Sequence, residues 1–336
     1  MIDLHLHLDG SLTAGALLTL AKHDNIPLPC QDEAALLPLL QAEPDCPSLG
    51  VYLEKFDLPL QVLQREYAIE NGVYFLLKRL AEQGLCYAEI RFAPQLHLQK
   101  GLTQEQVVFA AVRGLEKGIA EFGILAQLIL CCMRMDSNEE ENLETVRAAK
   151  SFLGKGVCAV DLAGNEAGFP TKKFTEVFSL AKALNVPFTL HAGEAAGAES
   201  VQEALDLGAC RIGHGIRSVE RDDLMTRLAQ EKIPLELCYT SNLQTKAVTD
   251  AADYPICRFL ERGIPVTVNT DNMTVSGTDL RREYTLLQAH FQLPDDTLLT
   301  LACNAADATF LPTGQKTQLK EQIRKKFVHW LKDPDV

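Results

Sequence analysis

MIDLHLHLDGSL, at residues 1–12, is the stretch that sets the expected fold. Its leucines alternate with His5, His7 and Asp9, which is the period of two typical of a β-strand. Alternate side chains of a strand share a face, so we expect these three polar side chains to point one way and the leucines to be buried. Two imidazoles whose Cα atoms lie roughly 6–7 Å apart can converge on one metal ion. The H-x-H pattern alone leaves two interpretations open, a metal site or hydrogen-bonded histidines on an edge strand.

Further apolar runs follow this strand and alternate with helical stretches. The runs lie at residues 85–92, 124–133, 157–162, 186–190, 210–212, 233–237 and 264–268. Helices are predicted between them over residues 103–122, 137–153, 173–184, 201–207, 221–230 and 251–261. Eight buried strands that alternate with helices predict an α/β fold, a closed (β/α)8 TIM barrel. The alternative is an open doubly wound sheet, whose usual glycine-rich phosphate loop after the first strand is absent.

No linker or low-complexity segment divides the chain, so we expect a single domain over residues 1–336. Residues 13–84 are predicted to be a helical insertion after the first strand, and it would act as a lid. Its helices are expected over residues 14–23, 33–40 and 66–83. Two more helices, near residues 295–310 and 318–331, would follow the last strand.

The composition narrows the possible partners. A formal net charge of −13 opposes the phosphate neutralisation that drives nucleic-acid binding, so no nucleic-acid partner is expected. No apolar run approaches the roughly 20 residues that span a membrane, and no secretory signal is evident. The 10 cysteines form no C-x-x-C pair and lie mostly in apolar runs, which indicates reduced thiols in a cytoplasmic protein.

Polar residues gather where the predicted strands end. They form the motifs DLAG (161–164), HAGE (191–194), GHG (213–215), TSN (240–242) and NTDN (269–272). The carboxyl ends of barrel strands share one mouth, so these motifs should converge. Catalytic zinc takes nitrogen and oxygen ligands, and four such residues would meet there: His5, His7, His191 and Asp271. No lysine ends an interior strand to supply a bridging ligand, so one metal ion is expected.

Two further titratable residues belong to the same mouth. His214 could orient a water molecule and accept its proton, or it could be a packing histidine between two glycines. Glu194 could protonate a substrate atom, or it could be a helix-start carboxylate favoured by the helix dipole. Beside a metal ion, we favour the catalytic interpretation of both.

The ordered set HLHLDGSL, DLAG, HAGE, GHG, TSN and NTDN resembles the adenosine deaminase family of the metal-dependent hydrolase superfamily. The similarity runs over nearly the whole chain and includes KFDLP (55–59) in the insertion. The resemblance implies a barrel with one Zn²⁺ per chain. It also implies hydrolysis of the 6-amino group of adenosine, and of 2′-deoxyadenosine, to give the inosine product and ammonia.

The resemblance also implies a role for each site residue. His5, His7, His191 and Asp271 match the zinc ligands, Glu194 the acid that protonates purine N1, and His214 the residue that orients and helps deprotonate the water. Asp9 matches the ligand of the ribose hydroxyls, Gly164 the N–H donor to purine N3, and Phe56 and Leu58 the apolar lid. By the same resemblance, Asn272 would face purine N7, at a position where many members of the family have aspartate. An amide carries donor hydrogens at any pH, whereas a carboxylate donates only when it is protonated. A smaller departure is Tyr239, where a proline is common.

Several alternatives stay open for the substrate and for the class of protein. The substrate could be adenine or an N6-substituted adenine nucleoside or nucleotide. A phosphate would require Arg or Lys at the mouth, and the nearest candidates, Arg217 and Lys246, lie outside the motifs, so a neutral purine nucleoside fits better. From another class, the chain could be a non-catalytic nucleoside-binding protein on the same scaffold, although no catalytic position is lost.

Overall fold

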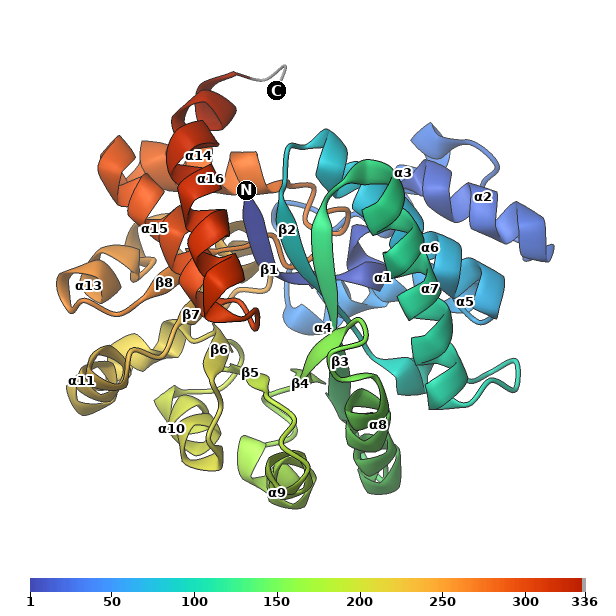
Figure 1. Ribbon diagram of the computed structural model, residues 1–336, viewed down its shortest axis with the longest axis horizontal. Helices are drawn as coiled ribbons and strands as arrows, with labels where there is room; N and C mark the ends of the chain where they lie inside the picture. Colours follow the sequence, from blue (N-terminus) through green and yellow to red (C-terminus); the bar gives the residue numbers. More distant parts are fainter. Residues whose placement is uncertain (334–336) are drawn as a thin grey trace.

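Parallel β-strands form the centre of the computed structural model, which describes residues 1–333, and helices surround them (Figure 1). The strands are β1 (Ile2–His7), β2 (Tyr87–Phe92), β3 (Leu125–Arg134), β4 (Val157–Gly164), β5 (Thr189–Ala192), β6 (Arg211–His214), β7 (Leu235–Leu237) and β8 (Val266–Val268). Hydrogen bonds join them in chain order as β1-β2-β3-β4 and β5-β6-β7-β8. All six neighbouring pairs within these two sheets are parallel.

The two sheets meet at two seams. At one seam Val160 of β4 bridges Phe188, just before β5. At the other seam Leu6 of β1 bridges Asp271, just after β8. There the His7 N–H donates to the Asp271 carbonyl at 2.7 Å. The predicted α/β barrel of eight strands is therefore confirmed, and its first and last strands are joined beside the candidate site.

Helices fill the connections between the strands. Between β1 and β2 lie α1 (Leu8–Ser11), α2 (Ala14–Asp24), α3 (Glu33–Leu40), α4 (Leu49–Leu53), the 3₁₀ turn η1 (Glu54–Phe56), α5 (Asp57–Val62) and α6 (Glu66–Glu82). From β2 to β6 lie η2 (Pro94–Leu96), α7 (Gln104–Phe122), α8 (Glu139–Phe152), η3 (Thr171–Phe174), α9 (Thr175–Ala183) and α10 (Ala198–Leu207). After β6 lie η4 (Ile216–Glu220), α11 (Asp222–Glu231), α12 (Tyr239–Gln244), η5 (Ala251–Asp253), α13 (Ile256–Glu261), α14 (Leu280–Phe291), α15 (Asp295–Ala308) and α16 (Thr313–Lys332). Within residues 1–333, α14, the short helices α1, α4, α5 and α12, and some of the 3₁₀ turns have no counterpart among the expected helices.

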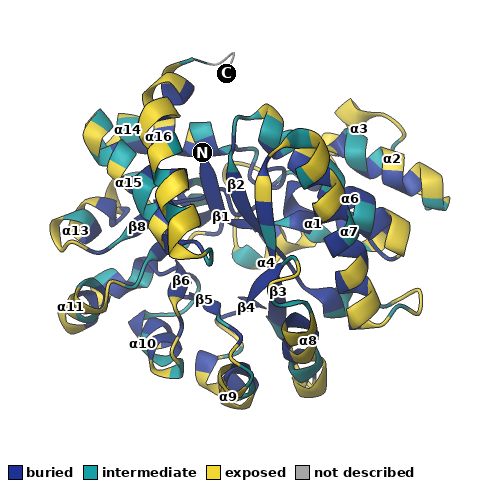
Figure 2. Ribbon diagram, viewed as in Figure 1, coloured by how far each residue is buried: buried dark blue, intermediate teal, exposed yellow. Residues whose placement is uncertain are grey.

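Local signals place these helices. Helix α7 begins at a capping box between Thr103 and Gln106 and ends at Gly123, whose φ of 70° suits a left-handed C-cap. Its apolar residues recur every three to four positions, and the side of the helix that they form is buried against the barrel. Figure 2 shows the same arrangement around the ring, with buried strands at the centre and exposed helix faces turned outward.

The first strand is shorter than expected. It ends at His7, and the chain then makes the one-turn helix α1, so Asp9 does not continue the strand. The expectation that His5, His7 and Asp9 share one strand face is therefore wrong for Asp9. The turn is possible because Gly10 packs tightly on Asn272, where an added Cβ would lie 2.0 Å from the amide oxygen.

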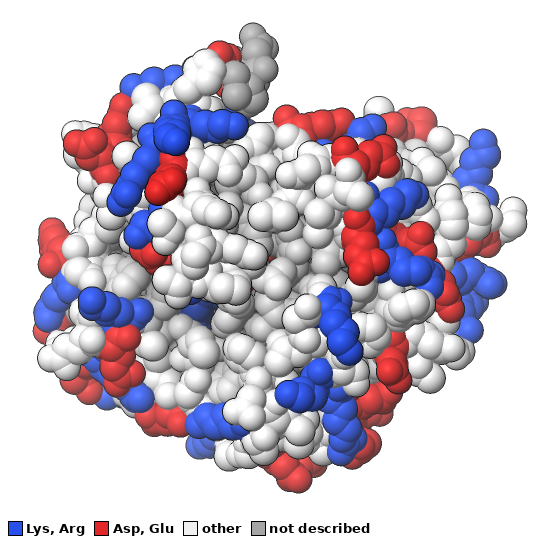
Figure 3. All heavy atoms as spheres, viewed as in Figure 1, with Lys and Arg blue, Asp and Glu red and all other residues white. Residues whose placement is uncertain are grey.

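The surface of the face in Figure 3 carries both signs of charge. Acidic and basic side chains lie intermingled around its rim, and uncharged atoms cover most of its centre. Within residues 1–333, no helix combines the length and the apolar character that crossing a bilayer requires.

Candidate functional site

A pocket of about 230 Å³ opens where the strands end. It is lined by His7, Asp9, Leu49, Tyr52, Leu53, Phe56, Leu60, Ala93, Leu96, Cys131, Met133, Ala163, Gly164, His191, Glu194, His214, Thr245, Asp271 and Asn272. Strand ends from all around the barrel contribute, and helices α4 and α5 of the insertion supply apolar side chains. The convergence of the strand-end motifs is therefore observed.

The insertion places one expected residue elsewhere. Phe56 and Leu60 lie four residues apart in continuous helical turns, so they face the pocket together. Leu58 is half-buried and packs against the main hydrophobic core instead of lining the pocket. Position 60, and not position 58, thus supplies the second apolar contact of this segment.

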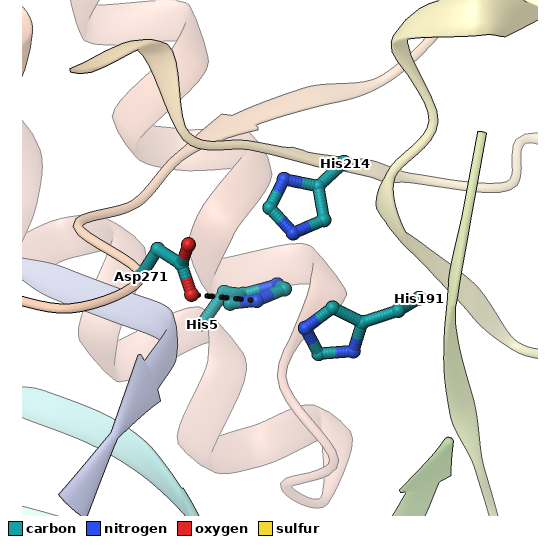
Figure 4. A group of neighbouring side chains, drawn as sticks. All are labelled: His5, His191, His214 and Asp271. Atoms are coloured by element: carbon teal, nitrogen blue, oxygen red, sulfur yellow. Dashed lines mark ion pairs between the residues drawn. The ribbon is translucent and has the colours of Figure 1, made fainter. Parts of the chain in front are cut away.

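Four imidazoles and one carboxylate crowd together beside this pocket, and four of the five side chains are drawn in Figure 4. His7 Nε2 lies 3.3 Å from His191 Nε2 and 3.3 Å from Asp271 Oδ1, and His5 Nε2 lies 3.5 Å from the same oxygen. One ligand atom each from His5, His191, His214 and Asp271 lies within 4.8 Å of the others. Ligands about 2.1 Å from a tetrahedral zinc ion are about 3.4 Å apart, so the observed spacing fits such an ion.

Two of the imidazole rings, those of His5 and His191, have a carboxylate beside Nδ1, the ring nitrogen that faces away from the cluster. His5 Nδ1 lies 2.8 Å from Glu236 Oε2, and His191 Nδ1 lies 2.7 Å from Asp161 Oδ2. Both Nε2 atoms are therefore turned toward the cluster, and that of His5 is buried with no hydrogen-bond partner among the described residues. Metal-binding histidines characteristically donate their other N–H to a carboxylate in this way. Burial lowers the pKa of His191, but the charge and hydrogen bond of Asp161 outweigh burial and raise it.

The protonation states of the remaining donors suit a cation. Burial lowers the pKa of His5 to about 4, and the charge of Arg91 adds to the effect. Burial also holds the pKa of His7 well below its usual value. Burial alone would favour the neutral form of Asp271, but the close approach of His5 and of the other imidazoles holds its pKa well below the usual range. Neutral imidazoles and an ionised carboxylate are the forms that bind metal ions, so this group of residues implies a metal ion.

Glu194 and His214 face each other at the edge of this cluster. Glu194 Oε2 lies 3.6 Å from His214 Nε2, and Glu194 Oε1 accepts a hydrogen bond from Thr245 Oγ1 at 3.2 Å. Burial raises the pKa of Glu194, and the nearby His214 only partly offsets the effect. A carboxyl group in this environment keeps its proton at higher pH than a free glutamate does.

The loop that carries Glu194 is held by another carboxylate, Glu166. Its oxygens accept the backbone N–H groups of four successive residues, 193–196, at 2.6–3.0 Å, and they also accept the Ser200 hydroxyl at 2.5 Å. Charge-assisted bonds of this kind are strong and fix the direction of the backbone. This role of Glu166 could not be predicted from the sequence, because nothing in its local pattern shows which backbone groups its carboxylate contacts.

The TSN triplet in α12 anchors three different groups. Thr240 donates its N–H and its hydroxyl to Glu283, and Ser241 Oγ donates to Asp271 Oδ2 at 2.6 Å. Asn242 Nδ2 donates to His214 Nδ1 at 2.9 Å. The sequence shows the motif, but its role in positioning these groups depends on contacts with residues that lie far away in the chain.

A buried charge network lies beneath the cluster. Arg91 contacts Asp161 and Glu236 at 2.9 Å each, and Arg211 contacts Glu236 and Glu89 at 2.6 Å each. All five side chains are at most 1% exposed. This network is not among the residues predicted from the sequence, although the sequence carries a signal for it. Each charged residue interrupts a buried apolar strand, as in Leu-Glu-Leu at residues 235–237.

Comparisons with known proteins add a family and several relatives. Residues 1–326 match the family model described as "Adenosine deaminase". A protein of that name from Haemophilus ducreyi is 49% identical over 331 residues, which cover 97% of this chain and 96% of the relative.

Two solved structures are similar over nearly their whole length. The adenine deaminase of Arthrobacter aurescens superposes with a TM-score of 0.88 at 29% identity, covering 97% of this chain and 98% of that chain. The apo N6-methyl-AMP deaminase of Arabidopsis thaliana superposes with a TM-score of 0.84 at 26% identity, covering 98% and 97%. The barrel fold is thus shared by proteins named for different adenine compounds.

Proposed function

This chain belongs to the adenosine deaminase family, and we propose that it hydrolyses adenosine and 2′-deoxyadenosine to the corresponding inosine and ammonia. One observation carries the proposal. Nitrogen and oxygen donors at tetrahedral spacing lie in the same pocket as a buried carboxyl group whose pKa is raised. A metal site beside a proton donor is the combination that hydrolytic attack on an aromatic amidine carbon requires.

We infer that the metal is one Zn²⁺ per chain. Its proposed ligands are His5, His7, His191 and Asp271. The donor set is nitrogen and oxygen without sulfur, and the spacing of 3.3–3.5 Å supports a small tetrahedral ion. Zinc, when bound, would lower the pKa of a water molecule and stabilise the negative charge that develops on its oxygen.

The residues around the proposed ligands transfer protons and hold the reacting groups in place. We propose that Glu194 donates its proton to purine N1, which makes C6 a better electrophile. His214 holds the attacking water against C6, and Thr245 fixes the Glu194 carboxyl group by its hydrogen bond. The C6–N bond then breaks and C6 keeps the water oxygen as a carbonyl. One proton of the water leaves with the amino group as ammonia, and the other returns to the Glu194 carboxylate.

Other pocket residues would bind the nucleoside. We propose that Asp9 binds the ribose hydroxyls, that the Gly164 N–H reaches purine N3 and that Asn272 faces N7. Phe56 and Leu60 would cover the base as part of a lid formed by the insertion. All of these residues line the pocket, which supports their assignment.

A nucleoside is favoured over a nucleotide by the charge of the pocket. Its lining residues, all from the described part of the chain, include no lysine or arginine. Arg217 and Lys246 line a separate hollow of about 190 Å³ that adjoins the pocket at Glu194 and Thr245. A phosphate group would need cationic donors in direct contact. Adenine, the compound for which one structural relative is named, is the second candidate, because the same base contacts would serve it.

We also propose a place for this activity in cytoplasmic purine metabolism. All 10 cysteines are free thiols, and five of them are buried. Unpaired thiols in this number suit a reducing compartment.

The decisive experiment is an ultraviolet assay of purified protein against a substrate panel. The panel holds adenosine, 2′-deoxyadenosine, adenine, N6-methyladenosine and adenosine monophosphate. We expect the nucleosides to be deaminated fastest, the activity to disappear with a chelator and zinc to restore it. His191→Ala should abolish activity, whereas His329→Ala, an exposed histidine on α16, should not. Full activity after chelation and in His191→Ala would overturn the proposal.

A further inference from the structure

A chain of buried side chains runs from the pocket to an aromatic cluster behind it. His214 Nδ1 accepts a hydrogen bond from Asn242 Nδ2 at 2.9 Å, and Asn242 Oδ1 lies 3.3 Å from the Tyr254 hydroxyl. His214, Asn242 and Tyr254 are at most 3% exposed, so water does not replace these bonds. Nothing in the reaction outlined above uses Tyr254.

We propose that Tyr254 is a positioning residue for the deaminase reaction. It fixes the Asn242 amide, which in turn fixes His214 as the tautomer with its proton on Nε2. The inference rests on the proposed function, since it assigns the way in which His214 is prepared to hold the attacking water.

The direction of the amide follows from the bonds of Tyr254. Its hydroxyl has a single hydrogen-bond partner among the described residues, Asn242 Oδ1, and donates to it. If the amide were turned round, the buried O–H group would lose its acceptor, which costs about 1–3 kcal/mol. With the oxygen held toward Tyr254, the amide nitrogen faces His214 and donates to Nδ1. A nitrogen that accepts a hydrogen bond carries no proton, so the proton of the neutral ring is on Nε2.

The tyrosine ring is itself held rigidly. It meets Tyr239 edge to face with ring centres 4.8 Å apart, and Phe291 lies 6.1 Å away. His214, by contrast, has a φ of 58°, a left-handed backbone that is unfavourable for a residue with a side chain. The orientation of His214 therefore depends on outside contacts, and the Asn242 amide supplies the one at Nδ1.

The Nε2 proton gives His214 a defined task. The Nε2 atom faces the pocket, 3.6 Å from Glu194 Oε2. An N–H group at this point donates a hydrogen bond to the oxygen of the attacking water and so directs the remaining lone pair. The opposite tautomer would present a lone pair, which would accept an O–H of the water instead of directing its oxygen. In this proposal His214 therefore orients the water and does not take its proton. Loss of the Tyr254 hydroxyl should thus slow the chemical step while substrate binding is unchanged.

The first test compares two tyrosine variants of the metal-loaded enzyme. Tyr254→Phe keeps the aromatic packing and removes the hydroxyl, so kcat should fall about 3- to 10-fold with KM within about twofold, in keeping with the loss of one neutral hydrogen bond. Tyr239→Phe is the matched control, because it removes a neighbouring hydroxyl whose partner is His290, on the far side of the cluster. Its kcat should equal that of the parent. Equal kcat losses in both variants would overturn the inference.

A double-mutant cycle on kcat distinguishes an effect transmitted through Asn242 from a general effect on packing. Asn242→Ala should lower kcat further than Tyr254→Phe does, and adding Tyr254→Phe to it should cause no further loss. Independent, additive losses would contradict a route through Asn242. If Tyr254→Phe does not fold, Asn242→Asp serves instead, since a carboxylate cannot donate to Nδ1 and should draw the proton there. Unchanged kcat in Asn242→Asp would overturn the inference.

The activity of the parent enzyme distinguishes failure of the proposed function from failure of the role assigned to Tyr254. Absence of deamination by the parent protein with zinc would refute the proposed function. An active parent with an unaffected Tyr254→Phe variant would refute the role of Tyr254 alone.

Discussion

The proposed contact of Asn272 with purine N7 would let one side chain set the pH range of substrate binding. Its Oδ1 atom is buried and accepts no hydrogen bond within residues 1–333. The residue lines the pocket and packs against Gly10. Its amide offers donor hydrogens at any pH, so an acceptor on a bound purine can be recognised without a titration step.

The substitution Asn272→Asp should make that recognition depend on pH. The new carboxyl group would be buried near Asp271 and Asp9, and burial already raises the pKa of Asp9 to about 6. Only the protonated form would donate to N7, so KM should rise as pH increases from about 6 to 8, while the KM of the parent stays flat. Metal content should not change. Asn185→Asp, at an exposed position after α9, is the control. A flat KM profile for Asn272→Asp would contradict this role.

A second prediction about a single residue concerns Glu194 and the pH dependence of kcat. Burial raises its pKa, so the acid form persists to higher pH than for a free glutamate and is lost as pH rises through the shifted value. The parent kcat should therefore decline on the alkaline side. Glu194→Gln cannot transfer a proton, so kcat should fall about 10²- to 10⁴-fold, and the decline caused by this group should vanish. Glu199→Gln, exposed on α10, should behave as the parent.

Among whole elements, the insertion is fastened to the loop that follows β8. The Ala42 N–H donates to the Val275 carbonyl at 2.8 Å, and the Tyr52 hydroxyl shares a hydrogen bond of 2.7 Å with Ser276 Oγ. Ala42, Cys46, Tyr52 and Val275 form a small apolar cluster separate from the main core. If the insertion acts as the proposed lid, two hydrogen bonds and a small apolar cluster at this point should let it open at low cost.

The variant Tyr52→Phe should loosen the lid selectively. The ring still packs in the small cluster, but the bond to Ser276 is lost, which is worth about 0.5–1.5 kcal/mol. We expect KM for adenosine to rise about 2- to 10-fold with kcat nearly unchanged. Ser276→Ala should have the same effect, and the double variant should be no worse than either single one. Steady-state kinetics checks this, and a loss confined to kcat would contradict it.

The sequence predicts these elements better than it predicts their contacts. The period of two in β1 and the helical spacing in α3 and α6 give elements close to those observed. Helix α14 was missed, although its buried positions at 280, 284 and 287 recur at helical spacing. The docking of Tyr52 on Ser276 could not be predicted, because it depends on how two segments more than 200 residues apart meet in space.

For the molecule as a whole, the buried network under the metal cluster joins strands from both sheets. Arg91 on β2 contacts Asp161 on β4 and Glu236 on β7. Burial would raise the pKa of Glu236, but Arg91 and Arg211 outweigh it and hold that pKa well below its usual value. The stabilisation from this carboxylate is thus present above about pH 4 and is lost as pH falls. The motifs predict which residues bind the metal, but these supports follow only from the closed ring.

The variant Arg91→Met tests the network directly. It removes the arginine that contacts two buried carboxylates, Asp161 and Glu236, so the free energy of unfolding should fall by about 3–5 kcal/mol. Arg113→Met removes an arginine that also contacts two carboxylates but is 34% exposed, and it should cost about 1 kcal/mol or less. Urea denaturation followed by circular dichroism measures both changes. Equal losses in the two variants would show that burial does not set the strength of the network.

The seam between β1 and Asp271 also has a consequence for how the protein is made. His5 and His7 leave the ribosome early, whereas Asp271 emerges only when most of the barrel has been synthesised. The nascent chain therefore holds an incomplete set of the proposed ligands through most of translation, and its full affinity for a cation should arise only near the end. Metal uptake should report completion of the fold, and chains terminated before residue 271 should copurify with little metal.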